Sequence, residues 1–356
     1  MNDTAPIAAP DGSVLRVHAG RPDAPIAVEV TRGGMVESVH RVIAAVVDAD
    51  GRVVSSWGDA DRLVYGRSAI KPIQALPVLE SGAAAAYGLD DSEVTLCCAS
   101  HSGEPMHLDR VIAWLDRMGL SADDLECGQQ MPGHEPSARA LIQAGTTPTR
   151  AHNNCSGKHS GMLTTALHLG EPTKGYAGDD HPVQKRLKAV MAEMSGCDLS
   201  GVPTGYDGCG IPVFGVPLKG LATAMARFAD PSGLSAGRRA AVERIVASCA
   251  KNPLLIAGTD RFNSVVLAET GTRCLLKSGA EGVFAGAAID KGLGICLKVD
   301  DGTGRAAQVA FGAILVHLGV LDADAQRRLA NSLTTPTRNW EGRLVGVVRP
   351  APDLAF

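Results

Sequence analysis

The sequence has few aromatic residues, no excess of positive charge and no long hydrophobic run, and each deficit excludes a class of function. Aromatic residues make up 4% of the chain, whereas proteins that bind single-stranded nucleic acid stack bases on aromatic side chains. The net charge of −4 at pH 7 gives no strongly basic surface. Apolar stretches such as 42–47 and 310–316 are far shorter than the ~18 residues of a membrane span. We therefore expect neither nucleic acid nor a membrane as a partner.

The sequence also lacks the signs of an exported, disulfide-bonded protein. Residues 1–10 include Asp3 and no basic segment of the kind that begins a signal peptide. The nine cysteines are odd in number, and no two of them form a C-x-x-C pair. We predict free thiols in a reducing cytoplasm, most of them small, buried and apolar in character.

The composition that remains is that of a globular protein. Of the 356 residues, 45% are hydrophobic and 20% are charged, so the chain can bury a core without metal or disulfides. Residues 1–24 are rich in Pro, Ala, Gly and Asp and show no periodicity, which predicts a mobile leader. No repeat or linker divides the rest, and we predict a single domain over 25–356.

Strand and helix patterns occupy different parts of the chain. Strands are predicted near both ends, over 26–30, 39–47, 52–57, 273–277, 283–288, 294–299 and 344–348. Helices are predicted mainly between them, over 68–79, 108–118, 161–169, 183–194, 217–228, 237–249 and 306–318, with a short buried strand over 94–98. This order predicts an α+β fold with an antiparallel or mixed sheet built from both termini and an inserted helical region.

A serine and a lysine three positions apart are the first candidates for catalysis. Ser68 and Lys71 lie at the start of the predicted helix 68–79, on one face of it. A serine hydroxyl needs a base within reach, and a lysine can be that base where burial or a nearby cation lowers its pKa. Taken alone, the pattern is more often a serine N-cap followed by a surface lysine.

Two later segments carry further polar candidates. Ser100 and His101 follow the apolar run 94–98, and Lys277 ends the predicted strand 273–277. An early S-x-x-K, a later serine and a late K-[ST]-G is the order found in penicillin-recognising serine enzymes. The spacing departs from that class, because Ser100 follows Lys71 by only 29 positions. Taken singly, the serine is more often a turn former and the histidine a structural residue.

Two loops dense in Gly, Asn, His and Cys are expected at 152–162 and 205–212, each leading into a helix. They place Cys155 and Cys209 54 positions apart, with no C-x-x-C or H-E-x-x-H pattern nearby. Spacing alone indicates a zinc site only weakly, and a buried free thiol is the simpler interpretation of each cysteine.

Taken together, five co-linear segments resemble the bacterial L-asparaginases of the Rhizobium etli type, the thermolabile, inducible family. The segments are 65–72, 98–104, 154–159, 205–210 and 277–282, and the resemblance extends from residue 28 to 347. It implies a serine β-lactamase-like fold, in agreement with the sheet expected from both termini. It also implies hydrolysis of L-asparagine to L-aspartate and ammonia, and a homodimer.

The resemblance implies roles for individual residues. It implies two Ser–Lys pairs in the site, Ser68 with Lys71 and Ser100 with Lys277. Ser68 would be the nucleophile and Lys71 its base. Ser100 and Lys277 would relay protons and help to position the tetrahedral intermediate.

The same resemblance implies a zinc ion bound by two cysteines and a lysine. The ligands would be Cys155, Lys158 and Cys209, with Asp207 and His159 beside the metal. A lysine ligand must be neutral, so its pKa must fall far below ~10.4. Three protein ligands leave the fourth position of zinc open. Because a serine nucleophile is already present, we do not assign the metal the activation of water.

The charges of asparagine itself select further candidates. Its carboxylate requires a cation, and its ammonium group requires a carboxylate. Arg67 is the candidate for the carboxylate, and Asp207 or Glu281 for the ammonium group. We include His101 among the substrate-binding residues.

Two other functions stay open. One is a penicillin-interacting serine hydrolase that acts on other amides, against which the lack of an export signal counts. The other is an inactive zinc-binding protein of the same fold. The presence of both serines and both lysines counts against such a loss of activity.

Overall fold

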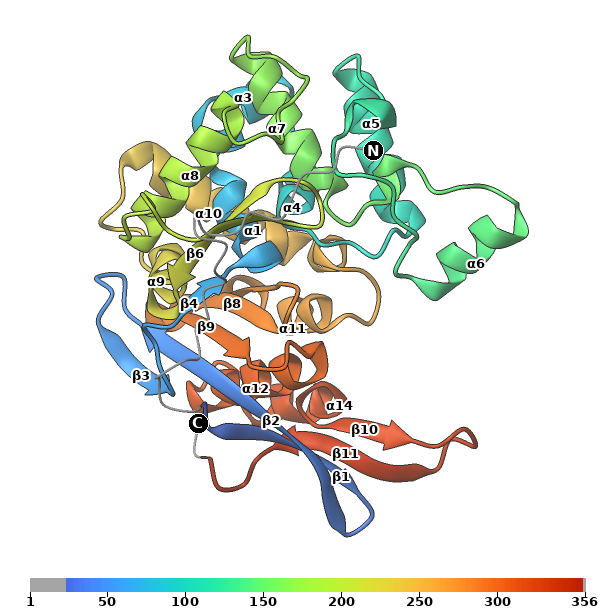
Figure 1. The fold of residues 1–356 in the computed structure, drawn as a ribbon, viewed down its shortest axis with the longest axis vertical. Helices are drawn as coiled ribbons and strands as arrows, with labels where there is room; N and C mark the ends of the chain where they lie inside the picture. The colour runs from blue at the N-terminus through green and yellow to red at the C-terminus, as the bar shows by residue number, and fades with distance from the viewer. Residues whose placement is uncertain (1–23, 355–356) are drawn as a thin grey trace, which may run out of the picture.

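The computed structural model describes residues 24–354 (Figure 1). Residues 1–23, which make up nearly all of the predicted leader, lie outside the described part, so the leader stays a prediction. In the view of Figure 1 a large sheet fills the lower half, and most helices lie above it.

The large sheet takes strands from both ends of the chain. They are β1 (Ile26–Arg32), β2 (Met35–Val47), β3 (Val53–Trp57), β7 (Cys274–Ser278), β8 (Val283–Ala288), β9 (Leu293–Val299), β10 (Thr335–Arg338) and β11 (Leu344–Pro350). Their order is β10-β11-β1-β2-β9-β8-β7, with β3 paired to β2, and all of these pairs are antiparallel. The predicted α+β class, with a sheet built from both termini, is confirmed.

Strand β2 shows that helices cover both faces of this sheet. Residues 42–47 are all fully buried. The odd-numbered side chains pack into a core shared with the inserted helices, and the even-numbered ones into a core shared with the C-terminal helix α12 (Gly304–His317). A strand covered on both faces is a continuous apolar run rather than an alternating one.

The region between β3 and β7 is mainly helical. Its helices are α1 (Lys71–Gln74), α2 (Leu76–Glu80), α3 (Ala83–Ala86), α4 (Asp91–Cys98), α5 (Pro105–Arg117), α6 (Glu135–Gln143), α7 (Ser156–His168), α8 (Pro182–Ser195), α9 (Leu218–Ala229), α10 (Ala236–Lys251) and α11 (Phe262–Thr270). A small sheet of β4 (Leu63–Tyr65), β6 (Pro212–Pro217) and β5 (Thr204–Tyr206) accompanies them. The short helices α13 (Ala323–Arg328) and α14 (Ala330–Leu333) follow α12.

The predicted strand over 94–98 is wrong, because these residues form the second half of helix α4. Asp90 caps the helix: its carboxylate accepts hydrogen bonds from the backbone of Ser92 and Glu93, and the Glu93 side chain accepts one from Asp90 in return. This capping box is a helix signal. The apolar run reflects burial of the helix in the core rather than a strand.

The predicted helix 68–79 is divided into three short pieces. A 3-10 turn, η1 (Arg67–Ile70), comes first, and α1 and α2 follow with Pro72 and Pro77 in their first turns. Proline is tolerated there but cannot continue a helix that precedes it. None of the helices in residues 24–354 is long and apolar enough to cross a membrane.

Candidate active site

The turn that carries Ser68 has a strained backbone held by an ion pair. Arg67 has a φ of +46°, which costs a residue with a side chain about 1–2 kcal/mol. Its guanidinium donates through Nε and Nη2 to Oδ1 of Asp207, at 3.0 and 2.9 Å. Strain of this kind persists where surrounding contacts fix the conformation. The ion pair therefore ties the Ser68 turn to the loop that carries Cys209.

The end of strand β7 lies directly against this turn. A Cβ added to Gly279 would be 3.0 Å from the backbone nitrogen of Ala69 and 3.1 Å from the carbonyl oxygen of Gly66. Only glycine allows so close an approach without displacing backbone. The contact places the K-S-G segment, and with it Lys277, beside Ser68.

Lys71 connects the turn to the second serine. It is fully buried, and its Nζ donates to the carbonyl oxygen of Ala99 at 2.5 Å, to Oγ of Ser100 at 2.9 Å and to the carbonyl oxygen of Asn154 at 3.4 Å. These contacts hold the amine of Lys71 between one hydroxyl and two carbonyl oxygens. Among residues 24–354, the serine hydroxyl that accepts a hydrogen bond from Lys71 is that of Ser100, and no hydrogen bond joins Lys71 to Ser68.

Lys277 lies in a different electrostatic environment. It is fully buried and donates to the carbonyl oxygen of Ser278 at 2.6 Å. Burial, and then the charge of Lys71, hold the pKa of Lys277 well below its usual range. Two nearby lysines in one buried site cannot both be charged at low cost, and Lys277 is the one whose pKa is lowered. No hydrogen bond within the described residues joins it to Ser100.

The three predicted metal ligands are close together and buried. Nζ of Lys158 donates to Sγ of Cys209 at 3.1 Å. A hydrogen bond from the Cys155 thiol, aided by the charge of Lys158, lowers the pKa of Cys209 to about 5 despite its burial. The Cys155 thiol also lies 2.9 Å from Oδ1 of Asn154, an alternative acceptor. The group thus contains a thiolate held between a thiol and an ammonium group.

This donor set suits zinc only if Lys158 loses its proton. Zinc binds thiolate sulfur and neutral nitrogen, and two thiols and one amine meet here. Across residues 24–354, no three His, Cys, Asp or Glu side chains gather in a way that could hold a metal, so a site here depends on the lysine. His159 follows Lys158, and its buried Nε2 has no partner among those residues. Its Nδ1 lies 2.8 Å from the Tyr176 hydroxyl.

The structure gives the remaining candidates clear positions. Both ring nitrogens of His101 have protein partners: Nε2 lies 2.8 Å from Oγ of Ser156, and Nδ1 accepts from the backbone of Gly103 at 3.2 Å. The ring therefore holds the loop after Ser100 in place. Glu281 is exposed in the turn between β7 and β8, at a φ of +58°. Whether either residue contacts a substrate stays a prediction.

Sequence reasoning missed two polar residues at this site. The carbonyl oxygen of Asn154 accepts from Lys71 and also from the backbone of His101, at 3.4 and 3.2 Å. Asn263 on α11 donates to Oγ of Ser278 at 2.9 Å. The motif 154–159 contains the first residue, so it could have been found. The second gave no signal, because α11 itself was not predicted.

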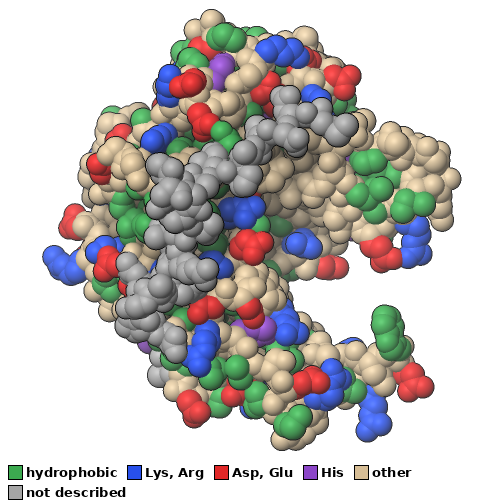
Figure 2. Space-filling model, in the orientation of Figure 1, with side chains coloured by type: hydrophobic (Ala, Val, Ile, Leu, Met, Phe, Trp, Pro, Cys, Tyr) green, Lys and Arg blue, Asp and Glu red, His purple; other side chains and the backbone are tan. Residues whose placement is uncertain are grey.

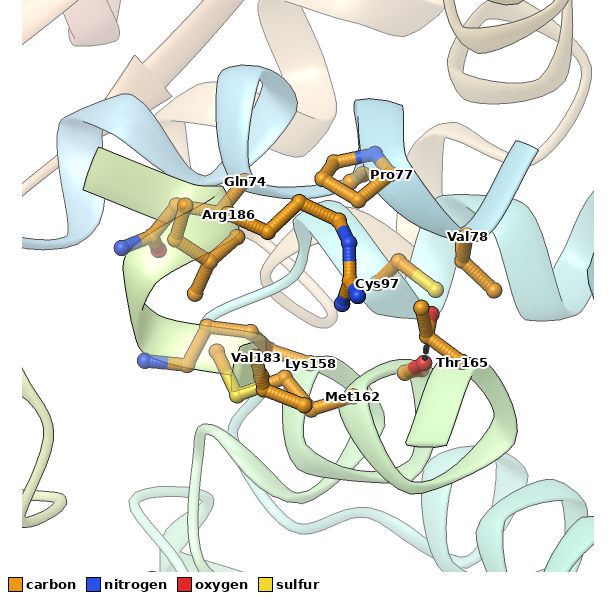
Figure 3. A pocket seen from close by; sticks show the side chains of 12 residues that line it. Gln74, Pro77, Val78, Cys97, Lys158, Met162, Thr165, Val183 and Arg186 are labelled. Carbon is orange, nitrogen blue, oxygen red and sulfur yellow. Dashed lines mark hydrogen bonds between the residues drawn. The ribbon is translucent and has the colours of Figure 1, made fainter. Parts of the chain in front are cut away.

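A separate small pocket, with a cavity volume of about 10 Å³, lies beside Lys158 between α1, α2, α4, α7 and α8 (Figure 3). Lys158 forms part of its wall, and the guanidinium of Arg186 points toward Cys97. Neither serine and neither of the lysines described above, Lys71 and Lys277, lines it. The pocket is therefore distinct from the polar site beside Ser68.

Fold and site together define an α+β protein that gathers two lysines and two serines at the edge of an antiparallel sheet. The chain belongs to the L-asparaginase II family, whose model matches residues 28–350. The predicted family is confirmed. Comparison with curated proteins gives no match.

Two solved structures are similar at low identity. A β-lactamase from Mycobacterium bovis is 16% identical with a TM-score of 0.39, over 82% of this chain and 95% of that chain. A candidate β-lactamase from Bacteroides dorei is 14% identical with a TM-score of 0.41, over 72% of this chain and 84% of that chain.

Proposed function

We propose that the protein is an asparaginase that hydrolyses L-asparagine to L-aspartate and ammonia, with Ser68 as nucleophile. The observation that carries the proposal is a pair of buried lysines beside the Ser68 turn, Lys71 bonded to Ser100 and Lys277 with a lowered pKa, in a chain of the L-asparaginase II family. A serine can attack an amide when a neutral amine accepts its proton.

The proposed reaction has two steps. Oγ of Ser68 attacks the side-chain amide carbon, its proton is taken up by the lysines, and ammonia leaves with a proton returned to it. Water then hydrolyses the ester to aspartate and restores the serine. We propose Lys71 as the base, with Ser100, which accepts its hydrogen bond, and Lys277, whose pKa is lowered, taking up and returning protons.

The substrate has charges that match Arg67 and Asp207. In the structure these two side chains satisfy each other. We propose that the carboxylate of asparagine takes the place of Asp207 on the guanidinium and that the ammonium group takes the place of Arg67 on the carboxylate. Glu281 is the alternative partner for the ammonium group, and His101 acts on the substrate through its loop.

We also propose that Cys155, Lys158 and Cys209 bind zinc. When bound, the ion would add positive charge next to Asp207 and would join the two loops that carry its ligands. Dialysis against a chelator should then release zinc at one equivalent per chain. Lys158→Met should abolish its retention, measured by atomic emission on the purified protein.

Ammonia release from L-asparagine tests the main proposal. Wild-type protein should release ammonia, and Ser68→Ala should reduce kcat to background. Activity that survives in Ser68→Ala would move the nucleophile to Ser100. If the wild type is inactive with asparagine but is acylated by a β-lactam, the penicillin-interacting alternative holds. Zinc retention without hydrolysis would favour the inactive zinc-binding protein.

We further propose that two copies of the chain associate. The far end of the sheet carries exposed apolar side chains, among them Met35 at 65%, Leu344 at 54% and Trp340 fully exposed. Figure 2 shows this end and the region of α6 extending to the same side, with a hollow between them. Light scattering should give the mass of two chains for the wild type and of one for Trp340→Glu. A cytoplasmic location stays a prediction.

A further inference from the structure

The two members of the second Ser–Lys pair lie on separate elements, and one stretch of chain connects them. Ser100 follows helix α4, and Lys277 lies in strand β7. Among residues 24–354, no hydrogen bond joins the two side chains. The segment 256–263, which leads into α11, is hydrogen-bonded both to the loop of Ser100 and to the end of β7. It can therefore set the position of Ser100 relative to Lys277.

This segment is attached at both of its ends. At one end the backbone nitrogen of Ser100 donates to the carbonyl oxygen of Ile256 at 3.0 Å. At the other end Nδ2 of Asn263, a buried residue of α11, donates to Oγ of Ser278 at 2.9 Å. Ser278 directly follows Lys277, and its carbonyl oxygen accepts the hydrogen bond from that lysine. Movement of the segment would therefore move one member of the pair relative to the other.

Between its ends the segment is held by a buried carboxylate. Glu104 is 7% exposed. Its Oε1 accepts hydrogen bonds from Oγ of Ser102 at 2.6 Å and from the backbone nitrogen of Thr259 at 2.8 Å. Its Oε2 accepts one from Oγ1 of Thr259 at 2.7 Å. Because Glu104 and Ser102 belong to the same loop as Ser100, this carboxylate joins that loop to the segment.

The hydrogen bonds keep Glu104 ionised and hold an unusual turn. Burial alone would raise the pKa of this carboxyl, but the hydrogen bonds from Ser102 and Thr259 outweigh it and lower that pKa below its usual value. Hydrogen bonds to a charged acceptor are stronger than those to a neutral one. Asp260, the residue after Thr259, has a φ of +56°. That conformation costs a residue with a side chain free energy and persists where contacts fix it.

We propose that Glu104 and Thr259 form a clamp that positions the second Ser–Lys pair for proton transfer. This inference rests on the proposed function, in which Ser100 and Lys277 take up and return protons. Glu104 and Thr259 are positioning residues, since they act through the segment 256–263. Proton transfer requires donor and acceptor at hydrogen-bond distance. A small displacement of the segment would therefore slow the reaction without removing a reacting group.

Removal of one hydroxyl group tests the clamp. Thr259 is exposed, so Thr259→Val leaves no cavity and should keep the fold. The kcat for ammonia release should fall roughly tenfold to a hundredfold, the scale of loss from misplaced reacting groups. The KM for L-asparagine should change less than threefold. Thr259→Ser keeps the hydroxyl and should restore kcat, whereas Glu104→Ala removes all three hydrogen bonds and should lower kcat further.

Thr270→Val is the matched control. Thr270 lies at the other end of α11, and its Oγ1 donates to the carbonyl oxygen of Val266 at 2.8 Å, within the same helix. This variant therefore loses a threonine hydrogen bond on α11 without loosening the clamp. It should leave kcat and KM unchanged.

A double variant tests whether the clamp acts through Lys277. In Lys277→Met the clamp has no lysine left to position. Addition of Thr259→Val to that variant should lower kcat less than twofold, although the same substitution costs tenfold or more in the wild-type background. Substitutions that act through one interaction are non-additive in this way. Equal losses in both backgrounds would mean that the turn supports another step, and would overturn the proposal.

A measurement without substrate separates the clamp from the proposed function. If the wild type releases no ammonia, the proposed function fails, and hydrogen exchange followed by mass spectrometry decides the clamp. The amide of Ser100 should exchange faster in Thr259→Val than in the wild type or in Thr270→Val, because the segment that accepts its hydrogen bond is loosened. Unchanged exchange would overturn the clamp. An unchanged kcat in Thr259→Val would also overturn it, while the asparaginase activity of the wild type stands.

Discussion

Lys158 and Lys277 are buried to a similar degree, but their pKa values shift in opposite directions. Burial, followed by the charge of Lys71, lowers the pKa of Lys277 well below the usual range. Burial alone would also lower the pKa of Lys158, but the influence of the two neighbouring cysteines, Cys209 before Cys155, outweighs it and raises that pKa above its usual value. Burial lowers the pKa of both lysines, and the presence or absence of a nearby anion decides whether that effect is outweighed.

The opposite pKa shifts suit Lys158 and Lys277 to different tasks. A lysine that is neutral at rest can take up a proton during a reaction, whereas a lysine paired with a thiolate holds its proton in place. Zinc would reverse the state of Lys158, since the metal cation would take over the charge that the proton supplies.

Replacing Lys277 should have the largest effect. In Lys277→Met, an apolar side chain of similar length fills the same volume, so the fold should persist. The kcat for ammonia release should fall roughly 100- to 10,000-fold, the range for a lost general base. Lys251→Met, at an exposed lysine paired with Asp91, is the control and should retain full activity. A kcat within threefold of wild type would remove Lys277 from the proton path.

Replacing Lys158 should act mainly on stability. In Lys158→Met the Cys209 thiolate loses its buried cation, and the free energy of unfolding of the metal-free protein should fall by about 3 kcal/mol. Urea denaturation followed by circular dichroism measures this change. Unchanged stability would mean that Cys209 is a neutral thiol in the folded protein and that Lys158 has no thiolate partner.

Gly279→Ala should displace the strand that carries Lys277 and leave the site of Lys158 unchanged. The added Cβ meets the Ala69 backbone at 3.0 Å, so β7 must move away from the Ser68 turn. Misplacement of reacting groups should lower kcat roughly tenfold or more. Zinc retention at Lys158 should stay at the wild-type level. Loss of both activity and zinc would point instead to general unfolding.

The smallest expected effect is a change in how stability depends on pH. In the unfolded chain Lys277 takes up a proton below its ordinary pKa of 10.5, but in the folded protein only at a much lower pH. Between these two values the unfolded state binds more protons, so the free energy of unfolding rises with pH by up to ~1.4 kcal/mol per unit. Urea midpoints measured across this range should rise less steeply for Lys277→Met. Identical slopes would contradict a lowered pKa.

The sequence pattern predicted the sheet well and the inserted helices less well. Its long strands were found because apolar runs or alternation mark them, as over 42–47. Helix α4 was taken for a strand, since burial on all sides removed the helical period from 94–98. Helix α11 was missed, and with it Asn263. The strand pairing of β1 with β11 depends on contacts far apart in the chain, which local pattern indicates only in outline.

Within the site, the sequence predicted which residues gather but not how they pair. Motifs led to both serines and both lysines. The hydrogen bond from Lys71 to Ser100, rather than to Ser68, depends on where the Ala99 and Asn154 carbonyl groups lie. Such positions follow from tertiary packing, which no local motif encodes. The pairing of Arg67 with Asp207 arises in the same way.

The antiparallel pairing of β1 with β11 also constrains how the protein is made. Val28 lies opposite Pro350 in the sheet. Strand β1 is therefore synthesised long before its partner strand β11. Closing so long a loop is slow, and contacts of this range delay folding. During synthesis strand β1 therefore lacks this neighbour until β11 has left the ribosome. A chain truncated before β11 would expose this edge to other chains and tend to aggregate.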